Sequence, residues 1–154
     1  MSAEQEPDGP SPFARAWSTP ERDAENFVVH RSERAFIIMN LYPYNAGHLL
    51  VVPVREAADL LELEEEESQE MMRLVRLGVK LLRHALAPHA FNIGMNLGRV
   101  AGAAIERHVH MHVVPRWNGD TNFMPVLADT RVISEEMAQV YGRLLHARAE
   151  LLGL

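Results

Sequence analysis

Three histidines stand at alternate positions in the segment RHVHMHVVPRW, residues 107–117, with Val109, Met111 and Val113 as the apolar residues between and after them. Neutral imidazole is a nucleophile near its usual pKa of about 6.5, and it also binds metals and forms hydrogen bonds. Three such side chains in one short segment indicate a chemical site, provided that the backbone brings them to one face.

The residues around the histidines predict a strand, because valine favours strands. Side chains alternate between the two faces of a strand. His108, His110 and His112 therefore share one face, and the apolar residues between them face the other side. The apolar face can pack on a helix, so the histidine face must meet something polar.

Three interpretations of this row stay open. The first is a set of exposed or paired histidines on a sheet surface. The second is a metal site, although the Cβ atoms of His108 and His112 would lie roughly 13 Å apart on a strand, so three rings reach one ion only with strain. The third is a row of imidazoles along an elongated anionic substrate, in which the middle ring attacks phosphorus and its neighbours bind the phosphoryl oxygens.

Composition narrows the classes of protein. The chain has 154 residues, 47% of them hydrophobic, which suits one domain with a core. Its 15 basic and 21 acidic residues give a formal charge of -6, which disfavours nucleic-acid binding. Without cysteine there is no disulfide, thiolate catalysis or cysteine-ligated zinc. No apolar stretch approaches membrane-spanning length and no secretory leader is evident, so we expect a cytoplasmic protein without a membrane partner.

The order of elements predicts an α+β fold. Residues 1–20 are rich in Pro, Ser, Gly and acids and predict a flexible tail, followed by one domain at 21–154. We expect an antiparallel sheet with one long helix and one C-terminal helix. The expected strands are residues 27–30, 35–39, 48–54, 91–96 and the histidine segment, and the expected helices run from about 68 to 86 and from about 134 onward.

The match to a known family extends beyond the histidines. The segment HVHMHVV resembles the motif of the histidine triad (HIT) superfamily, His-φ-His-φ-His-φ-φ with φ apolar. The segments NLYPYNAGHLLVVPVRE, FNIGMNLGRVAGA and HVVPRWNGDTNFMP resemble its fragile-histidine-triad and diadenosine-tetraphosphate phosphorylase branch. The resemblance covers roughly residues 27–132 and implies a HIT-like α+β fold.

The resemblance also implies an activity, that of a nucleotidyl hydrolase or transferase acting on dinucleoside polyphosphates. His110 would attack the α-phosphorus and form a nucleotidyl-histidine intermediate, which water or inorganic phosphate then resolves. His108 and His112 would orient phosphate oxygens and assist the leaving group. His48 matches a fourth family histidine near the phosphates; alternatively, it is a hairpin-end histidine bonded to the backbone.

Further positions match substrate-binding residues of the family. Asn40 matches a ribose contact, or else opens an Asx turn. Asn96 matches a residue that reaches the phosphates, or is a strand-end amide, whereas Ile38 and Leu50 match a base pocket but could be plain core. The remaining candidates lie in the two following loops: Gly98 and Gly102 for close backbone approach to phosphate, Arg107 for a longer phosphate chain or a pair with Glu106, and Trp117 for stacking on a base or on a partner chain.

Departures from the family pattern set the expected cofactors. Many relatives open with Cys-x-x-Cys, which helps to hold zinc, but here the corresponding stretch is SPFA (residues 11–14), so we expect no tightly bound metal, despite His30. Magnesium would arrive with the substrate. Ala103 and Ala104 stand where other branches carry a polar residue for the leaving group.

Two other functions remain alternatives: a nucleoside phosphoramidase and a non-catalytic nucleotide-binding protein. The intact triad favours an enzyme, because a sensor needs no nucleophile. The resemblance also implies a two-fold homodimer. Apolar residues beyond one stripe of the long helix, Met72, Leu74 and Leu81, fit such an interface, or else a helix buried on both sides within one chain.

Overall fold

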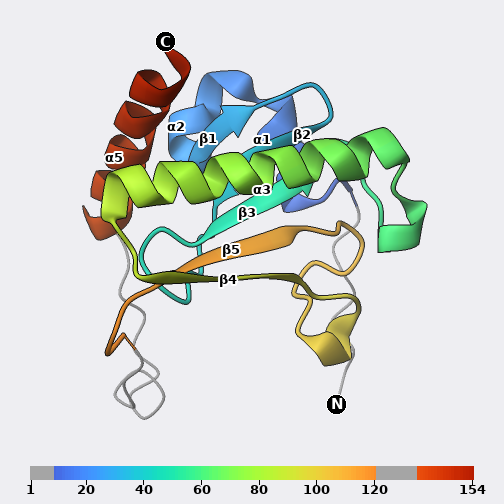
Figure 1. Cartoon of the computed structure of the whole chain (residues 1–154). Helices are drawn as coiled ribbons and strands as arrows, with labels where there is room; N and C mark the ends of the chain where they lie inside the picture. The colour runs from blue at the N-terminus through green and yellow to red at the C-terminus, as the bar shows by residue number, and fades with distance from the viewer. Residues whose placement is uncertain (1–8, 121–134) are drawn as a thin grey trace.

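The computed structural model describes residues 9–120 and 135–154. Within them, the chain forms one antiparallel five-stranded sheet in the order β1-β2-β3-β5-β4, crossed by one long helix (Figure 1). The strands are β1 (Val28–Arg31), β2 (Ala35–Met39), β3 (Leu49–Pro53), β4 (Ala90–Met95) and β5 (Met111–Arg116). The α-helices are α1 (Pro12–Ser18), α2 (Asp23–Asn26), α3 (Glu65–Leu86) and α5 (Glu135–Leu152). Short 3-10 helices are η1 (Pro20–Arg22), η2 (Leu60–Glu62) and η3 (Arg99–Ala101).

The expected α+β class is confirmed, including the long and the C-terminal helix. The long helix begins at Glu65, three residues before the expected start. Glu64 and Glu67 form a capping box there: each side chain accepts the backbone N–H of the other. Such a box satisfies amides that the first turn leaves unpaired, so the acidic run starts the helix.

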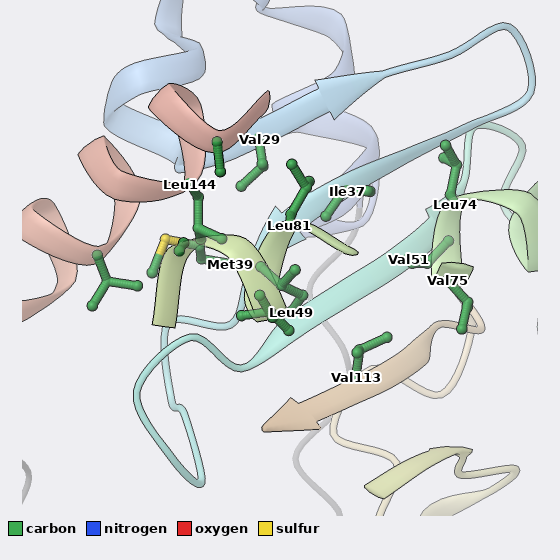
Figure 2. Packing of buried hydrophobic residues seen from close by; sticks show 14 of the residues in the cluster. Val29, Ile37, Met39, Leu49, Val51, Leu74, Val75, Leu81, Val113 and Leu144 are labelled. Atoms are coloured by element: carbon green, nitrogen blue, oxygen red, sulfur yellow. The ribbon is translucent and has the colours of Figure 1, made fainter. Parts of the chain in front are cut away.

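The sheet has two apolar faces because its side chains alternate. Leu49, Val51 and Val113 point toward α3 and form the main core with α3 and α5 (Figure 2). Leu50 and Ile38 point to the opposite face, where α1 supplies the cover. This register puts His112 on the α1 side as well, since it pairs with Leu50 across the ladder.

The prediction of a flexible tail is wrong for the described residues from Ser11 to Ser18. Ser11 caps α1 by accepting the N–H of Ala14, and a proline occupies the first turn. Phe13 and Ala16, three residues apart, are buried in the second core. The Pro-rich composition therefore marks a helix start here.

The expected histidine strand is shorter than predicted, because β5 begins only at Met111. Its neighbour β3 ends at Pro53, which has no N–H to continue the ladder. The N–H of Val109 bonds instead to the carbonyl oxygen of Ala57, beyond the end of β3. His108 and His110 thus lie in an extended segment before the strand, and His112 lies in it.

The helix residues assigned to a dimer interface mostly belong to the chain's own core. Leu74 and Leu81 are buried, and Met72 is half exposed. Both sides of α3 are used because the sheet lies under one flank and α5 packs along another. As for membranes, none of the helices in the described residues combines the length and the apolar character needed to cross one.

Gly47 fixes the approach of the chain to His48. Its φ is +82°, and an added Cβ would lie 2.5 Å from Leu86 Cδ1 and 2.9 Å from Leu82 Cδ2. We expect Gly47→Ala to lower the free energy of unfolding by about 2–4 kcal/mol, because backbone strain and overpacking add. Urea denaturation measures the loss.

The control is Gly119→Ala, since Gly119 has a φ of +76° and no atom within 4 Å of an added Cβ. It should show only the backbone cost of about 1–2 kcal/mol. Equal losses in the two variants would contradict the packing argument.

Candidate active site

His110 carries a lone pair on Nε2. Its Nδ1 lies 2.9 Å from the carbonyl oxygen of His108, and a carbonyl only accepts, so Nδ1–H is the donor. In a neutral ring the other nitrogen is then the base. Burial lowers the pKa of His110, although the bond to the carbonyl opposes this, so the ring stays neutral and nucleophilic around neutral pH.

His48 and His112 form a second hydrogen-bonded chain. The backbone N–H of Tyr44 donates to Nδ1 of His48 at 3.1 Å, so Nε2 of His48 carries the proton. That Nε2–H donates to Nδ1 of His112 at 2.9 Å. The proton of His112 is therefore on Nε2, a buried atom with no partner among the described residues.

Burial keeps the rings of His48 and His112 neutral. It lowers the pKa of His48 to about 3, with further contributions from the nearby His112 and His110. It lowers the pKa of His112 to about 4, again with a contribution from His110. The Nε2–H of His112, which has no partner among the described residues, is thus a neutral hydrogen-bond donor near His110. The centroids of the two rings lie 5.0 Å apart.

His108 has both ring nitrogens bound to protein groups, so in this structure neither is available for the predicted contact with phosphate oxygens. It is fully buried. Nε2–H donates to the carbonyl oxygen of Pro53 at 2.8 Å, and Nδ1 lies 2.6 Å from Oγ of Ser11. His48 is likewise fully buried and contacts His112 rather than the surface, so it supports a site residue from behind.

A groove of about 710 Å³ lies over this face of the sheet, beside the histidines. His112 lines it, whereas His110 does not and is only 6% exposed. The groove is lined mainly by polar and small residues: Tyr44, Asn45, Asn92, Ile93, Gly94, Met95, Asn96, Ala101, Gly102, His112, Val114, Arg116 and Asp120. Amides, imidazole and a guanidinium suit a polar, anionic ligand.

Two of the predicted loop residues lie at this groove. Asn96 and Gly102 line it together, and an added Cβ at Gly102 would lie 3.5 Å from Nδ2 of Asn96. Gly98 and Arg107 lie instead along a neighbouring depression formed with η2 and η3. Arg107 donates to the carbonyl oxygen of Gly9, and its Nε lies 3.8 Å from a carboxylate oxygen of Glu56.

The residues predicted for ribose and base have structural contacts of their own. Oδ1 of Asn40 accepts the N–H of Tyr42 at 2.9 Å, which is the Asx turn left open above. Ile38 and Leu50 are 6% and 4% exposed, in the core under α1. Trp117 is half-buried and does not line the groove; its backbone N–H donates to a carboxylate oxygen of Asp120 at 3.1 Å. Phe123, the other aromatic of that loop, lies outside the described residues.

Ser11, Phe13 and Tyr44 were missed as site residues. The ring of Phe13 packs edge-on against His108 and His110, at 5.5 Å and 5.0 Å. A signal for α1 was present: serine followed by proline is a helix start, with an apolar spacing of three behind it. The contact between Tyr44 and His48 had no signal, because it uses a backbone amide.

The segment matched to a zinc-binding pair does not fit that metal. Ser11 offers a hydroxyl where a thiolate would bind, and this oxygen already contacts Ala14 N and His108 Nδ1. Among residues 9–120 and 135–154, no group of three or more His, Cys, Asp or Glu is placed to hold a metal ion.

The sheet, the groove and the histidine row define a class of α+β protein with an imidazole site on a sheet face. A family model described as "HIT domain" matches residues 21–119, and the chain belongs to this family. One relative, the AP-4-A phosphorylase of Mycobacterium tuberculosis, is 42% identical to this chain over 113 residues, which is 73% of this chain. The chain spans only 58% of that protein's length.

Other relatives agree with the assignment to the family. An uncharacterized HIT-like protein of Methanocaldococcus jannaschii is 36% identical over 93 residues, 60% of this chain and 70% of its own. A crystal structure of a Zn-bound histidine triad family protein from Mycobacterium smegmatis has a TM-score of 0.74 at 26% identity, over 92% of this chain and 94% of that one. The expected HIT-like fold is confirmed.

The buried neutral histidines predict how stability depends on pH. Burial lowers the pKa of His48, His108, His110 and His112 in the folded chain, so below about pH 6.5 the unfolded chain binds more protons. Stability is therefore full above that pH and falls as the medium becomes more acidic. Each such histidine adds up to about 1.4 kcal/mol per pH unit to the slope.

Urea denaturation between pH 5 and 7.5 measures this slope. His112→Asn should reduce it by the contribution of one histidine, and His146→Gln, at a side chain that is 75% exposed, should leave it unchanged. A slope that is the same in all three proteins would contradict the prediction.

Proposed function

We propose that the chain is a nucleotidyl hydrolase or transferase that cleaves dinucleoside polyphosphates at the α-phosphorus, with a covalent nucleotidyl-histidine intermediate. The observation that carries this proposal is the bond from Nδ1 of His110 to the carbonyl oxygen of His108, which leaves Nε2 with a lone pair. The similarity to the protein named AP-4-A phosphorylase supports the substrate class.

The first step transfers a nucleotidyl group to His110. The lone pair on Nε2 forms a bond to the α-phosphorus, and the bond from phosphorus to the bridging oxygen breaks. The electron pair leaves with that oxygen, on the departing nucleotide. Nε2–H of His112 donates a hydrogen bond to it, since this donor is buried without another partner among the described residues.

The second step restores the enzyme. His110 now carries phosphorus on Nε2 and a proton on Nδ1, so its ring is positively charged, and the carbonyl oxygen of His108 stabilises that charge. An oxygen of water or of inorganic phosphate attacks phosphorus, the bond to nitrogen breaks, and its electron pair returns to Nε2. With water as the acceptor, the released proton passes to solvent.

The groove supports binding of the rest of the substrate. Asn96 and Gly102 line it beside His112, in reach of a phosphate chain that extends from the reacting phosphorus. Arg116 supplies positive charge further along the same groove, and Asp120 holds its guanidinium in place with contacts of 2.7 and 2.9 Å. Trp117, which follows Arg116 directly but does not line the groove, keeps both assignments: stacking on a base or a contact with a partner chain.

Replacement of the nucleophile tests the proposal. We expect His110→Ala to lower kcat with diadenosine tetraphosphate by several orders of magnitude while substrate Kd stays within about threefold, because other groups bind the substrate. Chromatography of the products measures turnover, and runs with and without inorganic phosphate identify the second acceptor. Near-normal turnover by His110→Ala, with loss in His108→Ala, would falsify the assignment.

No tightly bound metal is part of this proposal. Any magnesium ion would arrive with the substrate and neutralise its phosphates. The support is chemical: the stretch Ser11 to Ala14 provides no thiolate, and its hydroxyl is already hydrogen-bonded. Turnover by protein desalted from a chelator, with magnesium added back, belongs to the same assay.

The functional unit that we propose is a homodimer in the cytoplasm. The support is β4, an edge strand of the sheet whose residues are largely exposed, among them Ile93 at 47%. An uncovered edge strand offers unpaired backbone groups to a second copy, and two-fold contacts are the usual outcome.

Light scattering at micromolar concentration tests this assembly. We expect a dimer for the unmodified chain and a shift toward monomer for Ile93→Lys, because a buried lysine opposes pairing at an edge. Arg22, exposed on η1 beside α1 and α2, provides the control variant Arg22→Glu, which should remain a dimer. A monomer in the unmodified chain would remove the proposal.

A further inference from the structure

Ser11 links helix α1 to the histidine row through a completely buried hydroxyl. Its backbone N–H donates to a carboxylate oxygen of Glu56 at 2.7 Å, and its Oγ accepts the N–H of Ala14 at 3.0 Å. The same Oγ lies 2.6 Å from Nδ1 of His108, across 97 residues of sequence. Helix capping alone requires the second of these contacts and not the third.

The direction of the contact with His108 follows from its neighbours. The carbonyl oxygen of Pro53 can only accept, so the proton of the neutral His108 ring is on Nε2. Nδ1 then has a lone pair, and Ser11 must donate its hydroxyl proton to it. The oxygen's remaining capacity receives the N–H of Ala14, so both functions of the hydroxyl are in use.

This bond acts on the orientation of His110 through the backbone. The ring of His108 is held between Ser11 and Pro53, and the carbonyl oxygen of the same residue accepts Nδ1–H of His110. If the hydroxyl is removed, Nδ1 of His108 becomes a buried acceptor without a partner, which costs about 1–3 kcal/mol. A rotation of the ring or a change of its tautomer relieves that cost only by disturbing the bond to Pro53.

We propose that Ser11 is a positioning residue: by donating to Nδ1 of His108 it holds the carbonyl oxygen that keeps Nε2 of His110 unprotonated and directed at the substrate. This inference rests on the proposed function of His110. Phe13, on the same helix, packs against both rings, so α1 and the histidine row are aligned by two independent contacts. Helix α1 and its cap therefore help to position the histidines that they cover.

Three variants separate this role from helix capping. Ser11→Ala removes the cap and the donor. Ser11→Gly also removes the donor, but glycine at a cap position costs only a few tenths of a kcal/mol. Ser11→Thr keeps a hydroxyl for both contacts. The control for loss of a cap elsewhere is Asp59→Ala, because Asp59 caps η2 through Leu61 and does not touch the histidines.

We expect both donor-free variants to lose about 10- to 100-fold in kcat, with KM within about twofold, because misplacing the nucleophile affects the chemical step more than binding. Threonine should restore kcat to within about threefold, and Asp59→Ala should retain it. Loss of kcat in Ser11→Ala alone, with normal kcat in Ser11→Gly, would mean that the serine acts only as a cap and would overturn the proposal.

Nitrogen NMR of the histidine rings supplies a readout that needs no substrate. In the unmodified protein, the ring of His110 should carry its proton on Nδ1, and in Ser11→Gly a second tautomer of His108 or His110 should appear, with unchanged helix content by circular dichroism. Identical ring signals in the two proteins would overturn the role of Ser11. Absence of turnover by the unmodified protein would instead remove the proposed function and leave the ring signals to decide on Ser11.

Discussion

The hydrogen bond from Nδ1 of His110 to the carbonyl oxygen of His108 is the interaction on which the site depends. Neutral imidazole has one proton for two nitrogens, so fixing it on one of them decides where the lone pair lies. A backbone carbonyl does this more firmly than a side chain, since it cannot become a donor. The geometry of residues 108–110 is therefore part of the chemistry.

The same constraint recurs in the neighbouring chain of rings. The amide of Tyr44 fixes the proton of His48, and His48 in turn fixes that of His112. Each of the two series of hydrogen bonds starts at a backbone group with a fixed role: the carbonyl of His108 can only accept, and the N–H of Tyr44 can only donate. Low-dielectric surroundings keep the rings neutral, because burial is the largest cause of each lowered pKa. The proposed nucleophile, His110, and the hydrogen-bond donor of His112 are thus both neutral, and their rings lie side by side.

The sequence was sufficient for the strands of the sheet and for finding the histidine row, because both have local patterns. Alternation in the histidine segment predicted opposite faces for His112 and Val113, and the register confirms them, since His112 pairs with Leu50 and Val113 with Leu49. The predictions that were wrong depended on contacts between residues far apart in the sequence. Strand β5 begins only at Met111 because Pro53, far from it in the sequence, has no N–H to continue the ladder. Leu74 and Leu81 are core because α5 and the sheet meet α3 on different flanks.

The fate of His108 illustrates the same limit within the site. From spacing alone, three histidines in alternation are equivalent, and nothing local distinguishes a ring that meets substrate from one that does not. The difference arises at the end of β3. There the carbonyl oxygen of Pro53 accepts a hydrogen bond from Nε2 of His108, and α1 brings Ser11 to Nδ1 of the same ring. His108 thereby becomes an internal support, and its carbonyl oxygen, rather than its ring, binds the proposed nucleophile, His110.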